Sequence, residues 1–239
     1  MNLTDLTFLK EGKSKKIYTD GNFVYLEFKG DVRCSKYTTQ LDDEVALIRA
    51  KTSHLLFRKL REQYDFISSS EYIYPNVIKM DMATPLPLEV IPRYVAAGAV
   101  VKRFGFQEGY IFSKPVLKID YKTDEDDYLI TDELLLEKNI LDPRQLEELK
   151  FVSLSISNVL RNFFFKKKAD LWDFKMEFGI ASDGSIKLVD EISFDGMRLK
   201  SLITGESLDK DVYRETGDIN KVKEAYRNAF ELLFEGESL

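Results

Sequence analysis

The chain has 239 residues, of which 44% are hydrophobic and 13% aromatic, enough for one large or two small domains with a substantial core. The net charge of −6 argues against a general nucleic-acid-binding surface, which needs a basic excess. A single cysteine, Cys34, excludes an intrachain disulfide and a cysteine-based metal site. With no apolar run long enough to span a membrane and no signal peptide, we expect a cytoplasmic protein without a membrane partner.

The inventory of reactive side chains is restricted. His54 is the one histidine, and it lies among apolar residues at helical spacing, so we interpret it as structural. Histidine-based zinc chemistry and a Ser-His-Asp triad are therefore not expected. Catalysis would have to use carboxylates, lysines, arginines and a metal, an inventory that suits phosphoryl transfer.

The N-terminal part is rich in predicted strands. The pattern predicts strands over 13–19 and 23–28, joined at Asp20-Gly21, a typical hairpin turn. Lys13 and Lys15 follow Gly12 on one face and could cover the phosphates of a nucleotide. The alternative is an exposed edge strand protected by lysines.

The middle of the chain alternates between predicted elements and small residues. We expect a helix over 43–63, a strand over 71–79, and a linker or hinge over 80–87, which contains two prolines. The small-residue run 96–99 follows, where a strand would switch to a helix and the backbone could approach a ligand closely. Arg93, Lys102 and Arg103 would add cationic donors; the alternative is a short, tightly packed helix with a solvated basic end.

The C-terminal part favours an α+β fold. An acidic loop is expected over 123–127, and Asp142-Pro143 is a good helix start. That helix should run to about Phe165, and Asp218 should cap a final amphipathic helix. Because strands and helices segregate rather than alternate strictly, a parallel doubly wound sheet is disfavoured.

The most informative segment is a predicted hairpin over 173–179 and 188–193. Its charged and apolar residues alternate, and a two-residue turn at Asp183-Gly184 would place Glu177 directly opposite Asp190. Facing carboxylates repel unless a hard cation such as Mg²⁺ lies between them. Lys175, on the same face, would then lie beside a phosphate. The alternatives are an ordinary solvated face, or a longer loop that shifts the pairing.

Several of these segments resemble the motifs of one family. They are Gly12 to Tyr18, Pro87 to Val90 with Arg93, Ala96-Ala97-Gly98, Lys102-Arg103, Asp173 to Gly179, Asp190 to Ser193, and Leu208 to Asp211 with Tyr213-Arg214. The family is phosphoribosylaminoimidazole-succinocarboxamide (SAICAR) synthetase of purine biosynthesis. The resemblance is in order and spans nearly the whole chain.

The resemblance implies an α+β fold in two parts with antiparallel sheets and an ATP cleft between them. We assign residues 1–82 to a strand-rich domain that covers the nucleotide and 83–239 to a domain with the metal and substrate site. The implied enzyme is a carbon–nitrogen ligase that joins L-aspartate to the carboxylate of carboxyaminoimidazole ribonucleotide (CAIR), releasing ADP and phosphate. ATP, CAIR and L-aspartate would be its small-molecule partners; a homodimer is compatible with the resemblance.

The resemblance also implies roles for individual residues. Lys175 and Asp173 would act in or support catalysis, and Glu177 and Asp190 would bind Mg²⁺. The residues expected to bind ATP are Lys13, Lys15, Met80, Met82, Glu89 and Lys175. Those expected to bind the ribonucleotide are Arg93, Lys102, Arg103 and Arg198.

The chain also departs from the family pattern on the substrate side. Ala99 stands where the family has a serine, Tyr94 where it has an asparagine, and Lys200-Ser201 where it has tryptophan and aspartate. Ser193-Phe194-Asp195 lacks the family's proline, and residues 31–37 replace its first substrate loop. A ligase or kinase acting on another carboxylate is therefore an alternative, and a non-catalytic binding protein is a second one.

Overall fold

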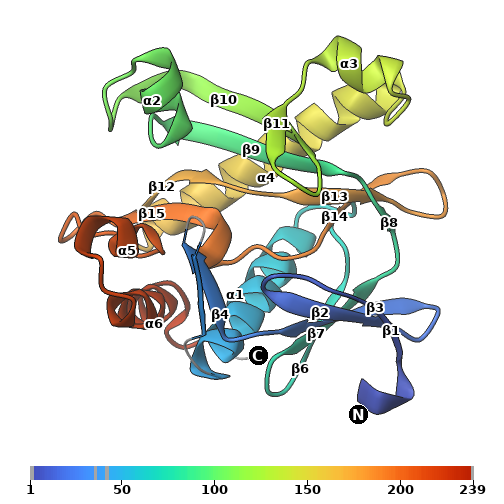
Figure 1. Ribbon diagram of the computed structural model, residues 1–239, viewed down its shortest axis with the longest axis horizontal. Coiled ribbons are helices and arrows are strands. Elements are labelled where there is room, and N and C mark those ends of the chain that lie inside the picture. Colours follow the sequence, from blue (N-terminus) through green and yellow to red (C-terminus); the bar gives the residue numbers. More distant parts are fainter. Residues whose placement is uncertain (1–2, 35–36, 41–42, 238–239) are drawn as a thin grey trace.

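The computed structural model describes residues 3–34, 37–40 and 43–237. An antiparallel sheet in the order β1-β2-β3-β7-β6 occupies its N-terminal part (Figure 1). Its strands are β1 (Thr7–Glu11), β2 (Lys15–Thr19), β3 (Phe23–Phe28), β6 (Ser70–Ile73) and β7 (Val77–Asp81). Because β2 lies between β1 and β3, the edge-strand interpretation is wrong for Lys15, whereas Lys13 lies before the strand.

Helix α1 (Asp43–Arg61) packs against this sheet with its apolar face. The side chain of His54 is buried there, with Nδ1 2.9 Å from Ser70 Oγ. This contact agrees with the structural interpretation of the histidine. A two-stranded hairpin precedes the helix, formed by β4 (Asp31–Cys34) and β5 (Tyr37–Gln40). Residues 35 and 36 of the altered substrate loop lie outside the described residues.

A second sheet has the order β11-β10-β9-β12-β15. Helix α4 (Pro143–Lys166) packs against it, and the predicted start is a capping box between Asp142 and Gln145. Most of the remaining elements belong to this half of the molecule, whereas the C-terminal helix packs against α1 and the first 3₁₀ turn lies beside the N-terminal sheet (Figure 1). The remaining elements are β8 (Thr84–Pro85), β9 (Leu88–Val95), α2 (Ala99–Phe104), β10 (Ile111–Lys122), β11 (Asp127–Leu129), α3 (Asp132–Glu137), β12 (Ala169–Phe174), β15 (Met197–Ser201), α5 (Asp211–Thr216) and α6 (Asn220–Phe234), with short 3₁₀ turns at Leu3–Asp5 and Phe194–Gly196.

The predicted strand 173–179 is two strands. β12 ends at Phe174, and β13 (Glu177–Ile180) begins after a break at Lys175 and Met176. The break occurs because Lys175 N donates to Gly196 O, while Met176 exchanges two hydrogen bonds with Val90 of the neighbouring strand. The chain thereby passes from the second sheet to the small sheet β14-β13-β8.

The predicted register of the hairpin is also wrong by one residue. Beyond the ends of β13 and β14 (Ile186–Val189), Ala181 N donates to Ser185 O, which leaves a loop of three residues, 182–184, in which Gly184 adopts a φ of 82°. Glu177 consequently faces Val189. Asp190 follows the last pair with a φ of 66°, a conformation uncommon outside glycine, and it begins a turn towards the second sheet.

No helix within the described ranges is both long and apolar enough to cross a bilayer.

Candidate active site

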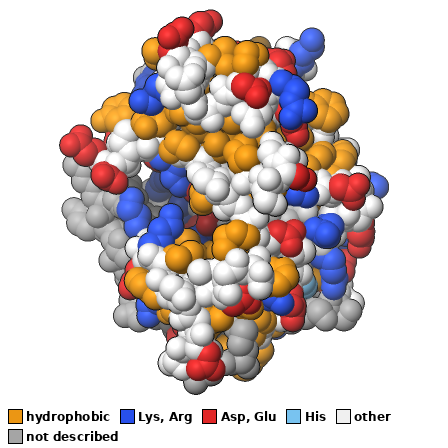
Figure 2. Space-filling view, turned by 90° about the vertical axis from the view of Figure 1, so that its right-hand side faces the viewer, with side chains coloured by type: hydrophobic (Ala, Val, Ile, Leu, Met, Phe, Trp, Pro, Cys, Tyr) orange, Lys and Arg blue, Asp and Glu red, His pale blue; other side chains and the backbone are white. Residues whose placement is uncertain are grey.

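A cleft lies between the N-terminal sheet and the strands around Glu177. Figure 2 shows a recess on this side of the molecule with Lys and Arg side chains gathered in and around it. Its polar part has a volume of about 290 Å³. It is lined by Lys10, Gly12, Lys13, Ser14, Lys15, Ile17, Glu89, Lys122, Lys175, Glu177, Asp190, Glu191, Ser193, Asp195 and Gly196.

An apolar pocket of about 420 Å³ adjoins it and shares Lys10, Ile17, Glu177 and Asp190 with the polar part. Its apolar walls come from the N-terminal sheet, the chain after β7 and the end of β14. They include Leu9, Val24, Leu26, Met80, Met82, Ala83, Pro85 and Val189. The two pockets therefore form one continuous cleft with an apolar end and a charged end.

Lys15 bridges two carboxylates that enter the cleft from the far half of the sequence. Its Nζ lies 2.7 Å from Asp190 Oδ2 and 2.8 Å from Glu191 Oε1, and its side chain is 9% exposed. Burial opposes the charge, but the two carboxylates outweigh it and raise the pKa of Lys15. Lys15 is therefore a fixed cation in the cleft.

Glu177 is held by a lysine that the sequence analysis missed. Lys122 Nζ, on β10, lies 2.5 Å from Glu177 Oε1. Burial and the neighbouring charge of Asp190 raise the pKa of Glu177 despite this contact. One sequence signal could have pointed to Lys122: Lys118, Asp120 and Lys122 are spaced two residues apart and therefore share one face of a strand.

The segment 190–195, which we call the carboxylate loop, contributes more than the predicted Asp190. Glu191 accepts hydrogen bonds from Ser14 Oγ at 3.2 Å and from Lys15. Burial opposes ionisation of Glu191, but Lys15 and Arg49 hold its pKa far below the usual range. Asp195 also lines the cleft. These three acids make the loop an anionic wall opposite the lysines.

Lys175 and Glu89, both predicted, form an ion pair at the edge of the polar pocket. Their Nζ and Oε1 atoms are 2.7 Å apart, and the lysine side chain is 46% exposed. Lys13 lines the same pocket and is exposed. The structure thus brings together Lys13, Lys15, Met80, Met82, Glu89, Lys175, Glu177 and Asp190 along one cleft.

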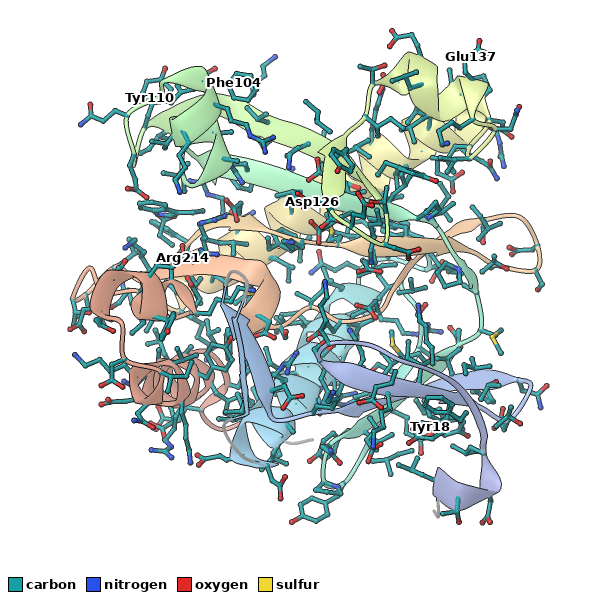
Figure 3. The ribbon with its side chains drawn as sticks, in the orientation of Figure 1. Tyr18, Phe104, Tyr110, Asp126, Glu137 and Arg214 are labelled. Carbon is teal, nitrogen blue, oxygen red and sulfur yellow. The ribbon has the colours of Figure 1, made fainter. Side chains whose placement is uncertain are left out.

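The predicted cationic residues occupy a different pocket. Lys102, Arg103 and Arg198 line a cavity of about 710 Å³ between α2 and α5. Figure 3 shows Arg214 on α5 across from the α2 region, where Phe104 and Tyr110 are labelled. Lys102 and Arg103 are exposed side chains. This cavity could therefore receive an anionic group.

Arg93 and Asp173 lie behind this cavity rather than in its lining. Arg93 Nε is 2.9 Å from Asp173 Oδ2, and its Nη1 donates to Ala97 O at 2.7 Å. Arg198 Nη1 donates to both oxygens of Asp173 at 2.9 Å, and its Nε donates to Asp211. Asp173 is 2% exposed. It therefore anchors two arginines, of which Arg198 reaches the cavity.

Gly98 makes room for this arginine. It has a φ of 60°, and a Cβ added there would lie 2.8 Å from Arg198 Nη2. We expect Gly98→Ala to push the guanidinium out of place, because Asp173 and Asp211 restrict where it can move. The KM for an anionic substrate bound in this cavity should rise about tenfold, while the KM for a ligand bound in the cleft beside Glu177 stays unchanged. Steady-state kinetics would measure this, with Gly205→Ala as the control, because a Cβ added at Gly205 would meet no atom within 4 Å. Equal KM values for the two variants would contradict the prediction.

The departures from the family pattern fall in distinct places. Ala99 lines the cationic cavity, whereas Tyr94 is buried on the opposite face of β9. Its hydroxyl lies 2.8 Å from Ser157 Oγ, and the Arg161 guanidinium lies 4.0 Å from its ring centre. Lys200 lines the cavity beside Trp172, with Nζ 5.3 Å from the ring centre. Tyr94 is thus a packing residue, whereas Ala99 and Lys200 line the cavity, and Ser193 and Asp195 line the polar pocket instead.

Comparison with known families decides the assignment. The model of the SAICAR synthetase family matches residues 8–232. The chain belongs to this family. It is 37% identical to the phosphoribosylaminoimidazole-succinocarboxamide synthase of Methanoculleus marisnigri over 89% of both chains. It is 35% identical to that of Methanothermobacter thermautotrophicus, over 97% of this chain and 94% of the relative.

Solved structures of the family share the fold. The synthase from Ehrlichia chaffeensis superposes with a TM-score of 0.89 at 30% identity, covering 95% of this chain and 98% of the other. A type-2 SAICAR synthetase in complex with ADP gives 0.87 at 30% identity, covering 96% and 99%. The resemblance and the α+β fold are confirmed. The chain is a carbon–nitrogen ligase of this family, as predicted.

Proposed function

We propose that this chain uses ATP to join L-aspartate to the carboxylate of CAIR, giving SAICAR, ADP and phosphate in purine biosynthesis. The observation that carries the proposal is the cleft itself. One end is apolar, and the other combines Lys15, Lys122 and Lys175 with the carboxylates of Glu177 and Asp190. Such a site can bind a ligand that has an apolar base at one end and a chain of phosphates at the other.

The nucleotide lies, in this proposal, between residues 1–82 and residues 83–239. Its adenine occupies the apolar pocket beside Met80 and Met82, and its phosphates extend towards Lys13 and Lys15. Glu89, at the edge of the polar pocket, lies near this path of the nucleotide, and we assign it to the ribose. The related type-2 synthetase that was solved in complex with ADP supports a nucleotide in this fold.

The donor set fits Mg²⁺. No cluster of three or more potential ligands was found among the described residues, but Mg²⁺ is commonly held by one or two carboxylates together with phosphates and water. Glu177 and Asp190 both line the polar pocket, and the charge of Asp190 raises the pKa of Glu177 after the effect of burial. A cation between them would relieve that repulsion. A bound Mg²⁺ would neutralise charge on the phosphate oxygens.

The chemistry requires activation of a poor acyl donor. A carboxylate oxygen of CAIR attacks the γ-phosphorus of ATP, and ADP leaves; the amine of aspartate then attacks the acyl carbon and displaces phosphate. Lys15 and Lys175 are placed to stabilise the charge of the transferring phosphoryl group. Asp173 supports catalysis indirectly, by holding Arg198. The phosphate of the ribonucleotide would bind to Arg198, Lys102 and Arg103. Arg93 would hold Asp173 in place from the side away from the cavity.

A ligase or kinase acting on a different carboxylate is the second candidate. Ala99 favours it, because this residue lines the cationic cavity where the family pattern has a serine. A non-catalytic binding protein is less consistent with the retained set of Lys13, Lys15, Lys175, Glu177 and Asp190.

ADP release by the purified protein tests the proposal. Mg²⁺, ATP, CAIR and L-aspartate are supplied together and then omitted one at a time. Release that requires all of them supports the proposal. Tight nucleotide binding without turnover on CAIR would overturn it in favour of the second candidate, and a screen of other carboxylates would then follow. Failure to bind nucleotide would contradict the assignment of the cleft to ATP.

A further inference from the structure

Arg49 on α1 is a buried cation that reaches the active site from behind. It is 0% exposed, and it has the largest volume among the fully buried side chains of the described residues. Neither the sequence motifs nor the proposed chemistry gives it a role. Burying a guanidinium is costly unless its partners compensate for the lost water.

One side of the guanidinium binds the backbone that leads into the altered substrate hairpin. Nη1 donates to Lys29 O and to Asp31 O, each at 3.0 Å. These carbonyls flank Gly30, where β3 continues into β4. The same stretch is tied to the phosphate side of the cleft, because Lys29 N donates to Ser14 O at 2.8 Å. Arg49 therefore fixes the entry of the hairpin relative to the lysine-bearing turn.

The other side faces the carboxylate loop. Nη2 lies 2.7 Å from Asp195 Oδ2 and 3.5 Å from Glu191 Oε1. Asp195 also accepts a hydrogen bond from the hydroxyl of Tyr226, whereas Glu191 shares Lys15 with Asp190. Without Arg49, Lys15 would be the remaining cation close to Glu191 and would be drawn more tightly to it.

The energetics give Arg49 a positioning role in addition to a stabilising one. Replacing Arg49 alone would leave the Asp195 carboxylate without its cation, which destabilises the fold as well as the site. A displacement of about 1 Å in an active site can cost on the order of 100-fold in rate. A long apolar side chain at position 49 should therefore keep the packing volume of the arginine while releasing the carboxylate loop.

We propose that Arg49 is a positioning residue that joins the start of β4 to the carboxylate loop and takes up the charge of Glu191 and Asp195, leaving Lys15 available to the nucleotide. This inference rests on the proposed function and deepens it. In this proposal, Arg49 on α1 couples the position of the altered substrate hairpin to the position of the proposed metal ligand Asp190.

The test compares Arg49→Met with Arg58→Met. Arg58 lies on the same helix, pairs with Glu237 at 3.1 Å and does not line the cleft. Arg49→Met should lower kcat at least tenfold, change the KM for ATP less than threefold and raise the Mg²⁺ concentration needed for half-maximal ADP binding in calorimetry. Because Asp195 loses its cation, the melting temperature should fall by about 6–12 °C, so the kinetic assays are run well below it. Arg58→Met should match the wild type in all four quantities.

Two further variants separate positioning from bulk stability. Arg49→Lys keeps the charge, but a single ammonium group cannot contact the hairpin carbonyls and the carboxylate loop at the same time. Its kcat should therefore lie between those of the wild type and Arg49→Met. In the Asp195→Asn background, Arg49→Met should cause a smaller loss than in the wild type, because the shared contact is already weakened. A wild-type kcat for Arg49→Met, fully additive losses, or unfolding of both Arg49 variants would overturn the inference.

The outcomes for the inference and for the proposed function are distinct. If the wild type turns over CAIR and Arg49→Met equals it, the inference fails and the proposed function stands. If the wild type does not turn over CAIR, the proposed function fails. The effect of Arg49→Met on the Mg²⁺ dependence of ADP binding still tests the inference in that case.

Discussion

Asp190→Asn is expected to lower kcat for ADP release by about 10³-fold or more. Asp190 lines the polar pocket beside Glu177 and receives Lys15 Nζ at 2.7 Å. The amide removes a charged oxygen ligand, and losing about 4 kcal/mol of transition-state stabilisation corresponds to about 10³-fold in rate. Lys15 would also lose one of its two carboxylate partners and shift towards Glu191. Initial rates at saturating substrates measure the effect.

Asp183→Asn provides the matched control for this prediction. It is the same substitution in the loop of the same hairpin, where the carboxylate is exposed and accepts hydrogen bonds from Ser185. Its kcat should remain within about twofold of the wild type, since surface substitutions have small effects. A kcat for Asp190→Asn within tenfold of the wild type would contradict the assignment of Asp190 to the phosphoryl-transfer site.

Asp173→Asn is expected to impair both stability and ribonucleotide binding. The side chain of Asp173 is 3% exposed and contacts the guanidinium groups of Arg93 and Arg198 at 2.9 Å. Removing one partner of a buried charge cluster costs about 3 kcal/mol or more, which corresponds to a fall in melting temperature of about 6–12 °C for a chain of this size. Because Arg198 loses its anchor, the KM for CAIR should rise by about 100-fold.

Asp170→Asn on the same strand is the control for this second prediction. Its carboxylate is partly exposed and accepts a hydrogen bond from Trp172 Nε1 at 3.0 Å. Thermal denaturation and KM values for CAIR and ATP should be measured for both variants. An Asp173→Asn protein that melts within 2 °C of the wild type and keeps its KM for CAIR would show that the two arginines do not depend on Asp173.

The sequence predicted the parts of the site that local alternation determines. Lys175, Glu177 and Asp190 were recognised because charged and apolar residues alternate around them, and the structure places all three on the cleft. The register failed because Gly184 closes a loop that is one residue longer than the predicted turn. The continuous strand failed because Met176 pairs with Val90, a contact that alternation does not reveal.

Contacts between distant segments were beyond sequence reasoning. Lys122 reaches Glu177 from β10, and Arg49 reaches Asp195 from α1. The alternation around Lys122 shows only that it shares a strand face with Lys118 and Asp120, and no motif marks Arg49; the partner of each depends on packing that exists only in the folded chain. Arg93 was predicted to face the substrate phosphate, yet its side chain is directed to Asp173 and Ala97 O. The orientation of a buried arginine side chain depends on such tertiary partners, which the local sequence does not reveal.

The path of a single oxygen atom tests the central claim most directly. CAIR labelled with oxygen-18 in its carboxylate is converted with ATP and L-aspartate, and the phosphate released is analysed by mass spectrometry. If the carboxylate attacks ATP and the amine then displaces phosphate, each phosphate should carry one labelled oxygen and SAICAR should retain the other. Formation of SAICAR with unlabelled phosphate, or ADP release without SAICAR, would contradict the account.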